Sequence, residues 1–173
     1  MTGRRVTTAV MIVAALVGVA LAGFLVGLRR KYPPVVDAVR RFARDVGNPQ
    51  MLRLAGRPGV DAAVVEHRGR TSGRPYRTPV TARRTDDGFV IALPYGAGTD
   101  WVKNVLHAGT ATLVSQGARH AVVRPEVVPV DEAAAYFPTR ERRMLALVGV
   151  EQCLRMRLDG SAPDRDAGRH ETF

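Results

Sequence analysis

Residues 66–80 read E-H-R-G-R-T-S-G-R-P-Y-R-T-P-V, a glycine-hinged turn flanked by apolar residues. The stretch contains two glycines, the adjacent hydroxyls of Thr71 and Ser72, and four arginines. Backbone N–H groups in such a turn, with arginine and hydroxyl donors beside them, are well suited to bind a phosphate or a polycarboxylate. The alternative is a polar loop with solvated arginines between two strands, and this stretch alone leaves both readings open.

A second stretch, residues 93–106, reads L-P-Y-G-A-G-T-D-W-V-K-N-V-L. The pairing of G-R-T-S-G-R-P-Y-R-T-P with the later D-W-V-K-N-V-L resembles the deazaflavin-dependent nitroreductase family, whose members use coenzyme F420. The resemblance covers roughly Ala62 to Leu158, and the combination of the two motifs carries it, since each alone is weak. It implies F420 as the cofactor, with FMN less favoured and haem left open.

The resemblance also implies where the coenzyme binds. The turn would hold its phosphate and acidic tail through Arg70, Thr71, Ser72 and Gly73. The following strand would lie beside it through Tyr76, Arg77, Thr78, Pro79 and Val80. Tyr95 and Gly96 match a loop over the deazaflavin ring, and a helix start that closes the site comprises Trp101, Val102, Lys103 and Asn104. From the residues alone, Trp101 is equally a core aromatic, Lys103 a solvated charge and Asn104 a helix-surface amide.

The implied chemistry is hydride transfer, which needs no protein nucleophile because the coenzyme carries the reaction. The proton donor for the reduced product is left open between Tyr95, Tyr136 and water. The tyrosine cluster that lines the substrate pocket of the family is absent near the C-terminus, leaving Tyr136 and Phe137. With Tyr95 and Trp101 they predict an aromatic pocket rim with few charges, which suits a flat apolar acceptor.

The pattern beyond residue 60 predicts short strands broken by turn residues. The expected strands are Ala62–His67, Thr78–Arg84, Phe89–Leu93, Ala111–Ser115, His120–Val123, Val127–Val130 and Gln152–Leu158. Asp100 is expected to cap a helix from Trp101 to His107 that ends at Ala108-Gly109, and two more helices are expected over Asp131–Tyr136 and Arg140–Val148. The fold class is therefore mainly β with helices (α+β), a small barrel with helices outside it. The resemblance implies the split β-barrel of the FMN-binding-like oxidoreductases.

The N-terminal third begins with an apolar segment. Val6–Leu28 comprises 23 residues without a charge and is followed by Arg29-Arg30-Lys31, which predicts one transmembrane helix. A cleaved signal peptide is the competing interpretation, because Ala20-Leu21-Ala22 has the form of a cleavage site. The apolar run continues to Leu28, which favours a retained anchor. The richer basic flank on the C-terminal side predicts a single-pass protein of the cell membrane with its catalytic domain in the cytoplasm.

Between the anchor and the barrel, Pro33-Pro34 is expected to open an amphipathic helix over Val35–Val46. This helix could lie on anionic lipid or pack on the domain, and the sequence leaves both open. Gly56–Gly59 marks a linker. The expected organisation is therefore an anchor at 1–31, helix and linker at 32–59, a deazaflavin-binding split β-barrel at 60–159 and a disordered tail at 160–173.

The formal net charge of +10 is concentrated in residues 1–60, which hold ten basic and two acidic side chains. This basic segment lacks interleaved aromatic residues for stacking on bases, which argues against nucleic-acid binding. The single cysteine, Cys153, allows no intramolecular disulfide, and His67, His107, His120 and His170 lack the spacing of metal ligands. We expect no metal site.

Together these observations predict a membrane-anchored oxidoreductase that transfers a hydride from reduced F420 to a lipophilic acceptor such as a quinone or a nitroaromatic compound. The alternative is a non-catalytic, membrane-tethered module that binds a phosphorylated cofactor or anionic lipid. The sequence does not fix the oligomeric state, and a homodimer is left open.

Overall fold

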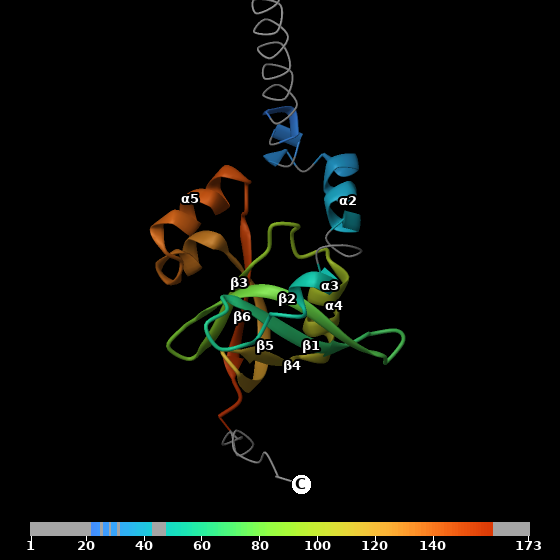
Figure 1. Ribbon diagram of the computed structural model, residues 1–173, viewed down its shortest axis with the longest axis vertical. Coiled ribbons are helices and arrows are strands. Elements are labelled where there is room, and N and C mark those ends of the chain that lie inside the picture. Colours follow the sequence, from blue (N-terminus) through green and yellow to red (C-terminus); the bar gives the residue numbers. More distant parts are fainter. Residues whose placement is uncertain (1–21, 25, 28, 31, 43–47, 161–173) are drawn as a thin grey trace, which may run out of the picture.

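The protein is built around a closed antiparallel barrel with the strand order β1-β2-β3-β6-β5-β4 (Figure 1). The computed structural model describes residues 22–24, 26–27, 29–30, 32–42 and 48–160. The strands are β1 (Ala62–Arg68), β2 (Pro75–Arg84), β3 (Gly88–Ala92), β4 (Thr110–Ser115), β5 (Ala118–Pro129) and β6 (Gln152–Leu158). Barrel closure pairs β1 with both β2 and β4, so that no strand is left with an open edge. The prediction of a mainly β fold with helices is confirmed.

Tight turns fix the register of neighbouring strands. Gln116 and Gly117 join β4 to β5 and have φ values of 52° and 81°, as a two-residue turn between twisted antiparallel strands requires. Gly88 begins β3 where the chain passes so close to β6 that a Cβ atom there would collide with the carbonyl oxygen of Met156. Only glycine fits at this close approach.

The fifth strand differs from the prediction. The sequence predicts two strands, His120–Val123 and Val127–Val130, whereas the structure has one strand from Ala118 to Pro129. The register against β6 shifts between Val123 and Glu126, and Arg124 within the shift has a φ of 53°. This β-bulge bends the strand without ending it, so that β5 can continue around the barrel.

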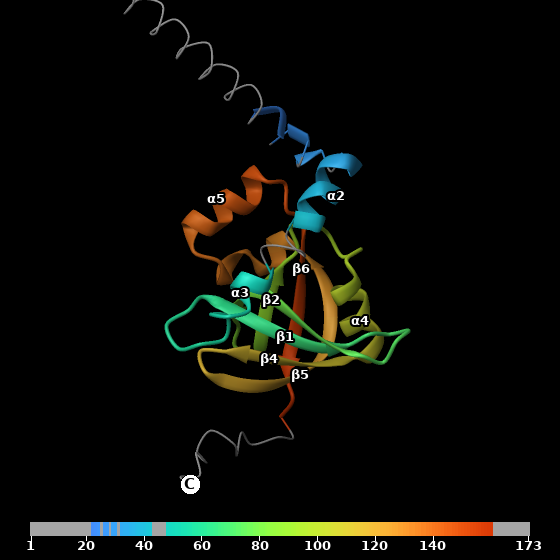
Figure 2. The same ribbon diagram turned by 45° about the vertical axis from the view of Figure 1, so that its right-hand side comes forward.

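Helices cover one side and one end of the barrel (Figure 2). They are α2 (Pro33–Phe42), α3 (Asn48–Met51), α4 (Asp100–Ala108), the 3₁₀ helix η2 (Val130–Tyr136) and α5 (Thr139–Leu147). α4 packs beside β1 and β4, whereas α2, α3 and α5 lie at the end of the barrel that is uppermost in both views. The end of α4 at Gly109, in the left-handed conformation, is as expected.

The helices differ from the sequence-based expectations in three details. The N-cap of α4 is Thr99 rather than Asp100, because Asp100 lies in the first helical turn and its side chain contacts Arg70. The helix expected over Asp131–Tyr136 is present and is a 3₁₀ helix that begins one residue earlier, at Val130. The short helix α3, which begins at Asn48, lies in a segment for which the sequence predicted no helix.

The core consists of two groups of buried side chains. The main group fills the barrel and the space beneath α4, and includes Val65, Ile91, Val105, Leu113 and Leu154. A smaller group lies between the barrel and η2, and includes Val90, Val128, Phe137 and Cys153. Burial raises the pKa of the Cys153 thiol to about 11, which keeps it protonated and unreactive at neutral pH.

The segment before β1 is hydrogen-bonded to the barrel. The N–H of Gly56 donates to the carbonyl of Ala62 at 2.6 Å, and the N–H of Gly117 donates to the carbonyl of Gly56 at 2.6 Å. Gly59 donates its N–H to the Oε1 atom of Gln116 at 2.7 Å. These bonds hold the glycine-rich segment against the β4–β5 turn.

Several predictions concern residues that the structure does not describe. Most of Val6–Leu28, the end of the predicted helix at Val46 and the tail after Gly160 belong to this group. Among the helices that are described, none combines the length and the apolar character needed to cross a membrane.

Candidate active site

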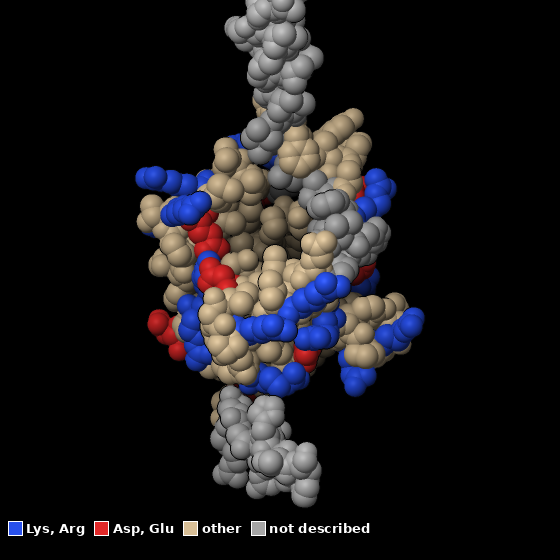
Figure 3. Space-filling model, viewed as in Figure 1, with Lys and Arg blue, Asp and Glu red and all other residues tan. Residues whose placement is uncertain are grey.

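A cavity of about 380 Å³ lies at the end of the barrel, between the strands and the surrounding helices (Figure 3). In the space-filling view the interior of the hollow is formed by uncharged residues, acidic and basic side chains lie along its left edge, and further basic side chains gather below it. The lining residues are Met51, Ala62, Pro79, Val80, Thr81, Ile91, Ala92, Leu93, Pro94, Tyr95, Gly96, Thr99, Trp101, Glu141 and Leu145. An apolar cavity with a few polar groups is the usual form of a binding site for a small organic molecule.

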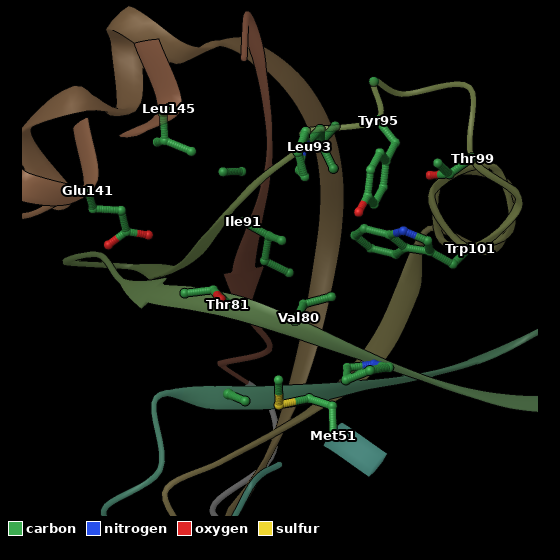
Figure 4. Close-up of a pocket in the computed structure, with 15 residues that line it drawn as sticks. Met51, Val80, Thr81, Ile91, Leu93, Tyr95, Thr99, Trp101, Glu141 and Leu145 are labelled. Atoms are coloured by element: carbon green, nitrogen blue, oxygen red, sulfur yellow. The ribbon is translucent and has the colours of Figure 1, made fainter. Parts of the chain in front are cut away.

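The two sides of the cavity differ in chemistry (Figure 4). Tyr95, from the loop after β3, and Trp101, from the first turn of α4, lie together on one side, with the phenol pointing toward the indole. Glu141 and Leu145, from α5, lie on the opposite side. The strands between them contribute Val80, from β2, and other apolar side chains, so that a flat ligand would be placed between aromatic and aliphatic surfaces.

The arginine-rich turn between β1 and β2 is fixed to α4 through Arg70. The backbone N–H of Arg70 donates to the Oδ1 atom of Asn104 at 3.1 Å, and its Nη1 atom donates to the same oxygen at 2.9 Å. Its Nη2 atom makes an ion pair with Asp100 at 3.0 Å. The N-terminal half of α4 therefore carries Trp101 into the cavity and, through Asp100 and Asn104, holds the basic turn beside it.

Asn104 in turn contacts the buried His67, whose side chain is 8% exposed. The Nδ2 atom of Asn104 lies 3.4 Å from His67 Nδ1, and His67 Nε2 lies 3.1 Å from Thr78 Oγ1. Because Oδ1 of Asn104 already accepts from Arg70, its Nδ2 must donate to an unprotonated Nδ1. Burial lowers the pKa of His67, which favours this neutral form. The ring also stacks on Tyr76, with centroids 5.8 Å apart.

Glu141, the acidic residue of the cavity wall, belongs to an ion-pair network. Arg83 donates from Nε to Glu141 Oε2 at 2.8 Å, and its two Nη atoms donate to the two carboxylate oxygens of Asp61 at 2.9 and 3.0 Å. The hydrogen bond from Arg83 lowers the pKa of Asp61, and the same pairing raises the pKa of Arg83. The network joins α5 to β2 and to the start of β1.

Comparison with known families supplies the context for this geometry. A profile of the F420H(2)-dependent quinone reductase family matches residues 35–152. This range covers both motifs, the cavity and all the strands except most of β6. The chain belongs to the F420H(2)-dependent quinone reductase family. The F420-dependent family expected from the two motifs is thereby confirmed.

The solved structures that this chain resembles are distant from it in sequence. A protein related to general stress protein 26, of the pyridoxinephosphate oxidase family, from Clostridium acetobutylicum is 11% identical with a TM-score of 0.44, and the match covers 68% of this chain and 84% of that chain. The heme storage protein HutZ from Vibrio cholerae is 12% identical with a TM-score of 0.44, and the match covers 64% and 89%. A heme-binding protein from Mycobacterium smegmatis is 15% identical with a TM-score of 0.40, covering 58% and 52%. A search of curated protein sequences found no match.

The structure brings some of the expected F420-site residues together in the cavity and places others nearby. Pro79, Val80, Tyr95, Gly96 and Trp101 line the cavity. Arg70, Thr71, Ser72 and Gly73 form the adjoining turn, with Tyr76, Arg77 and Thr78 on the strand that leaves it. Asn104 is 6% exposed and binds Arg70 of the turn, so it is not a helix-surface amide. Val102 is fully buried in the core, and Lys103 is exposed.

The expected aromatic rim needs correction. Tyr136 does not line the cavity, and Phe137 is 3% exposed and packs in the smaller core group. Glu141 and Leu145 occupy the wall that the sequence assigned to aromatic residues. Sequence reasoning missed both, together with Met51, Thr81 and His67. The four-residue spacing of Glu141 and Leu145 on one helix face was an available signal, but it does not indicate which face meets the cavity.

Proposed function

We propose that the protein transfers a hydride from reduced F420 to a lipophilic acceptor, of which a quinone is the best-supported class and a nitroaromatic compound the second. Family membership supports the reaction class. The observation that carries the proposal here is the position of α4, whose first turn joins the apolar cavity to the arginine-rich turn. One ligand with a flat ring and an anionic tail could contact both.

The residues fit such a coenzyme at both ends. Trp101 and Tyr95 offer aromatic surface for the ring. In the turn, the N–H groups of Thr71 and Ser72 have no acceptor within the described part of the chain. Arg68 and Arg74 make no ion pair with any described residue, whereas Arg70 is paired with Asp100. We therefore assign the anionic tail to Arg68, Arg74 and the free N–H groups, with Arg70 holding the turn in place.

Bound F420H(2) would supply the hydride, and the protein would orient the reactants and exclude water. Reduction of a quinone to a quinol takes up one hydride and one proton. Tyr95 is the phenol that the cavity provides, and we assign its Oη atom as the proton donor, replenished from solvent. The apolar residues Val80, Ile91 and Leu145 keep bulk water away from the acceptor.

We further propose that the Val6–Leu28 segment anchors the protein in the cell membrane with the barrel in the cytoplasm. The uncharged length of this segment and the basic residues after it support the proposal. Tethering would raise the effective concentration of the site near lipid-dissolved acceptors. For the fold, we propose that the closed barrel belongs to the split β-barrel class, which the resemblance of the two motifs implies.

The proposal can be tested with two acceptors. The full chain and a variant lacking residues 1–31 are compared in the reduction of a water-soluble quinone and of a long-tailed quinone in vesicles, with F420H(2) as donor. The deletion should leave the soluble reaction nearly unchanged and slow the vesicle reaction. Equal loss on both acceptors would contradict the role of the anchor. A parallel titration with F420, FMN and haem should show tight binding of F420 alone.

A further inference from the structure

Helix α5 has two faces with different roles. Glu141 and Leu145, one helical turn apart, line the cavity. Residues three and four positions apart share a helix face, so Arg140, Met144 and Leu147 follow one another along the outer side. Met144 is 54% exposed and Leu147 is 50% exposed, and no residue of α5 is buried. The outer side therefore presents two large apolar side chains, with the exposed Arg140 and Arg143 beside them.

The C-terminal end of α5 contacts the residues that follow the apolar N-terminal run. The Nη1 atom of Arg29 donates to the carbonyl oxygen of Ala146 at 3.0 Å, and Gly149 packs against Arg29. Phe24, Val26 and Tyr32 are exposed near this junction, at 43%, 53% and 58%. In both ribbon views α5 and the described N-terminal helical residues lie at the same end of the molecule.

We propose that the outer side of α5 lies on the surface of an anionic lipid bilayer, with Met144 and Leu147 at the level of the headgroups and Arg140 and Arg143 against lipid phosphates. This inference rests on the proposed membrane attachment and extends it to a second contact surface. Exposed apolar side chains with arginines beside them favour contact with an anionic bilayer, because the apolar groups are buried among the lipids and the arginines are attracted by the lipid charge.

A bilayer fits this surface better than a protein partner does. Two exposed apolar side chains on a nine-residue helix are far from the roughly 800 Å² per partner that a stable protein interface buries. A bilayer needs no complementary surface, and its negative charge matches the arginines. The attachment of Arg29 to α5 also fixes this helix beside the chain segment that follows the uncharged Val6–Leu28 run.

The arrangement gives the acceptor a route. Because the inner side of α5 lines the cavity, contact of the outer side with lipid would leave only the width of one helix, about 10 Å, between the cavity and the bilayer. A lipophilic acceptor that leaves the bilayer beside α5 would then have a short path to Tyr95 and Trp101 on the opposite side of the cavity. α5 would thus be both the wall of the site and its contact with the membrane.

Fluorescent labelling tests the contact directly. Cys153 is buried, so that an introduced Leu147→Cys can be labelled selectively with a polarity-sensitive dye. Leu106→Cys on α4, where the native side chain is 38% exposed, is the matched control. In full-length protein reconstituted into vesicles containing phosphatidylglycerol, the label at 147 should shift to shorter wavelength and be quenched by nitroxide lipids, whereas the label at 106 should be quenched by aqueous iodide. Equal access of iodide to both labels, or disulfide cross-linking between two copies through unlabelled Leu147→Cys, would overturn the proposal.

A kinetic comparison separates this inference from the proposed reaction. Met144→Glu and Leu147→Glu should raise the KM for a long-tailed quinone in the same vesicles about tenfold, with an unchanged rate on a water-soluble quinone, because the local acceptor concentration falls. Leu106→Glu should change neither. An unchanged KM in both α5 variants would contradict the lipid contact. Failure of all proteins to reduce the soluble quinone would instead refute the reaction, and the labelling result would still decide the lipid contact.

Discussion

Asn104 and Arg70 are 34 residues apart in sequence, yet a single oxygen of Asn104 accepts hydrogen bonds from both the backbone and the side chain of Arg70. This pair determines where the arginine-rich turn lies relative to α4. It also fixes the orientation of the Asn104 amide, whose nitrogen must face His67. The proposed coenzyme site is therefore supported by a polar network that the coenzyme itself need not touch.

Asn104→Ala should weaken F420 binding without a direct contact being lost. A hydrogen bond that involves a charged group contributes roughly 1.5–3 kcal/mol, so that release of Arg70 should destabilise the protein by about that amount. The turn would lose its position, and the dissociation constant for F420 should rise roughly tenfold or more. Urea unfolding and F420 titration measure the two effects, with Lys103→Ala, an exposed neighbour, as the control. Unchanged affinity in a folded Asn104→Ala protein would refute the supporting role of this pair.

His67 should make stability and coenzyme affinity depend on pH. Burial lowers its pKa in the folded protein below the ordinary value of 6.5, so the neutral ring is favoured on folding. This contribution is fully present above pH 6.5 and is lost as the pH falls through the folded pKa, with a slope of up to about 1.4 kcal/mol per pH unit. If Nδ1 of His67 were protonated, two N–H donors would face each other, because Asn104 Nδ2 is also a donor. This would favour rotation of the Asn104 amide, and Oδ1 would then lose both of its hydrogen bonds from Arg70.

The measurement is urea unfolding and F420 titration between pH 7.5 and pH 5 on the native protein and on His67→Gln, which carries no titrating group at this position. The native protein should lose stability and affinity over this interval, and the variant should show a shallower slope in both. Parallel pH curves for the two proteins would mean that another group is responsible.

The network around Arg83 predicts an order of destabilisation. Arg83 and Glu141 are each 20% exposed in their side chains, whereas Asp61 is 75% exposed. Removal of one partner from a partly buried pair should cost about 1–3 kcal/mol, between the values for exposed and fully buried pairs. Arg83→Ala should therefore destabilise most, Glu141→Gln less, and Asp61→Asn by less than about 1 kcal/mol. Urea midpoints give this order directly, and a larger loss in Asp61→Asn than in Glu141→Gln would contradict it.

Tyr95→Phe tests the assignment of the proton donor. General acid catalysis by a positioned side chain contributes typically about 10²–10⁴-fold, so kcat for quinone reduction should fall by at least about 10² while F420 binding stays near the native value. Tyr136→Phe, outside the cavity, is the control and should have native kcat. A fall in kcat of less than about tenfold in Tyr95→Phe would indicate that water supplies the proton.

Much of the barrel was predictable because its signals are local. Gln152–Leu158 was predicted with its observed bounds, β1 differs from its prediction by one residue, and Gly109 ends α4 as expected. The continuity of β5 was not predictable, because Arg124-Pro125 resembles a strand break and only pairing with β6 shows it to be a bulge.

The site was predictable in its motifs and not in its contacts. Tyr95 and Trp101 lie within recognisable motifs, and both line the cavity. Two features depend on how α4 and α5 pack on the barrel. Arg70 binds Asp100 and Asn104, and the cavity wall contains Glu141 where Tyr136 was expected. That docking is a tertiary property, which the spacing of residues on each helix does not encode.

The most direct test of the account is an anaerobic single-turnover reaction of the full-length protein with F420H(2) and a water-soluble quinone. Oxidised F420 and quinol should appear together, one for one, and Trp101→Ala should slow their appearance because the deazaflavin ring loses its aromatic support. Absorbance of oxidised F420 and chromatography of the quinol give the two yields. Tight binding of F420H(2) with no oxidation in the presence of quinone would contradict the account and favour a non-catalytic, coenzyme-binding module.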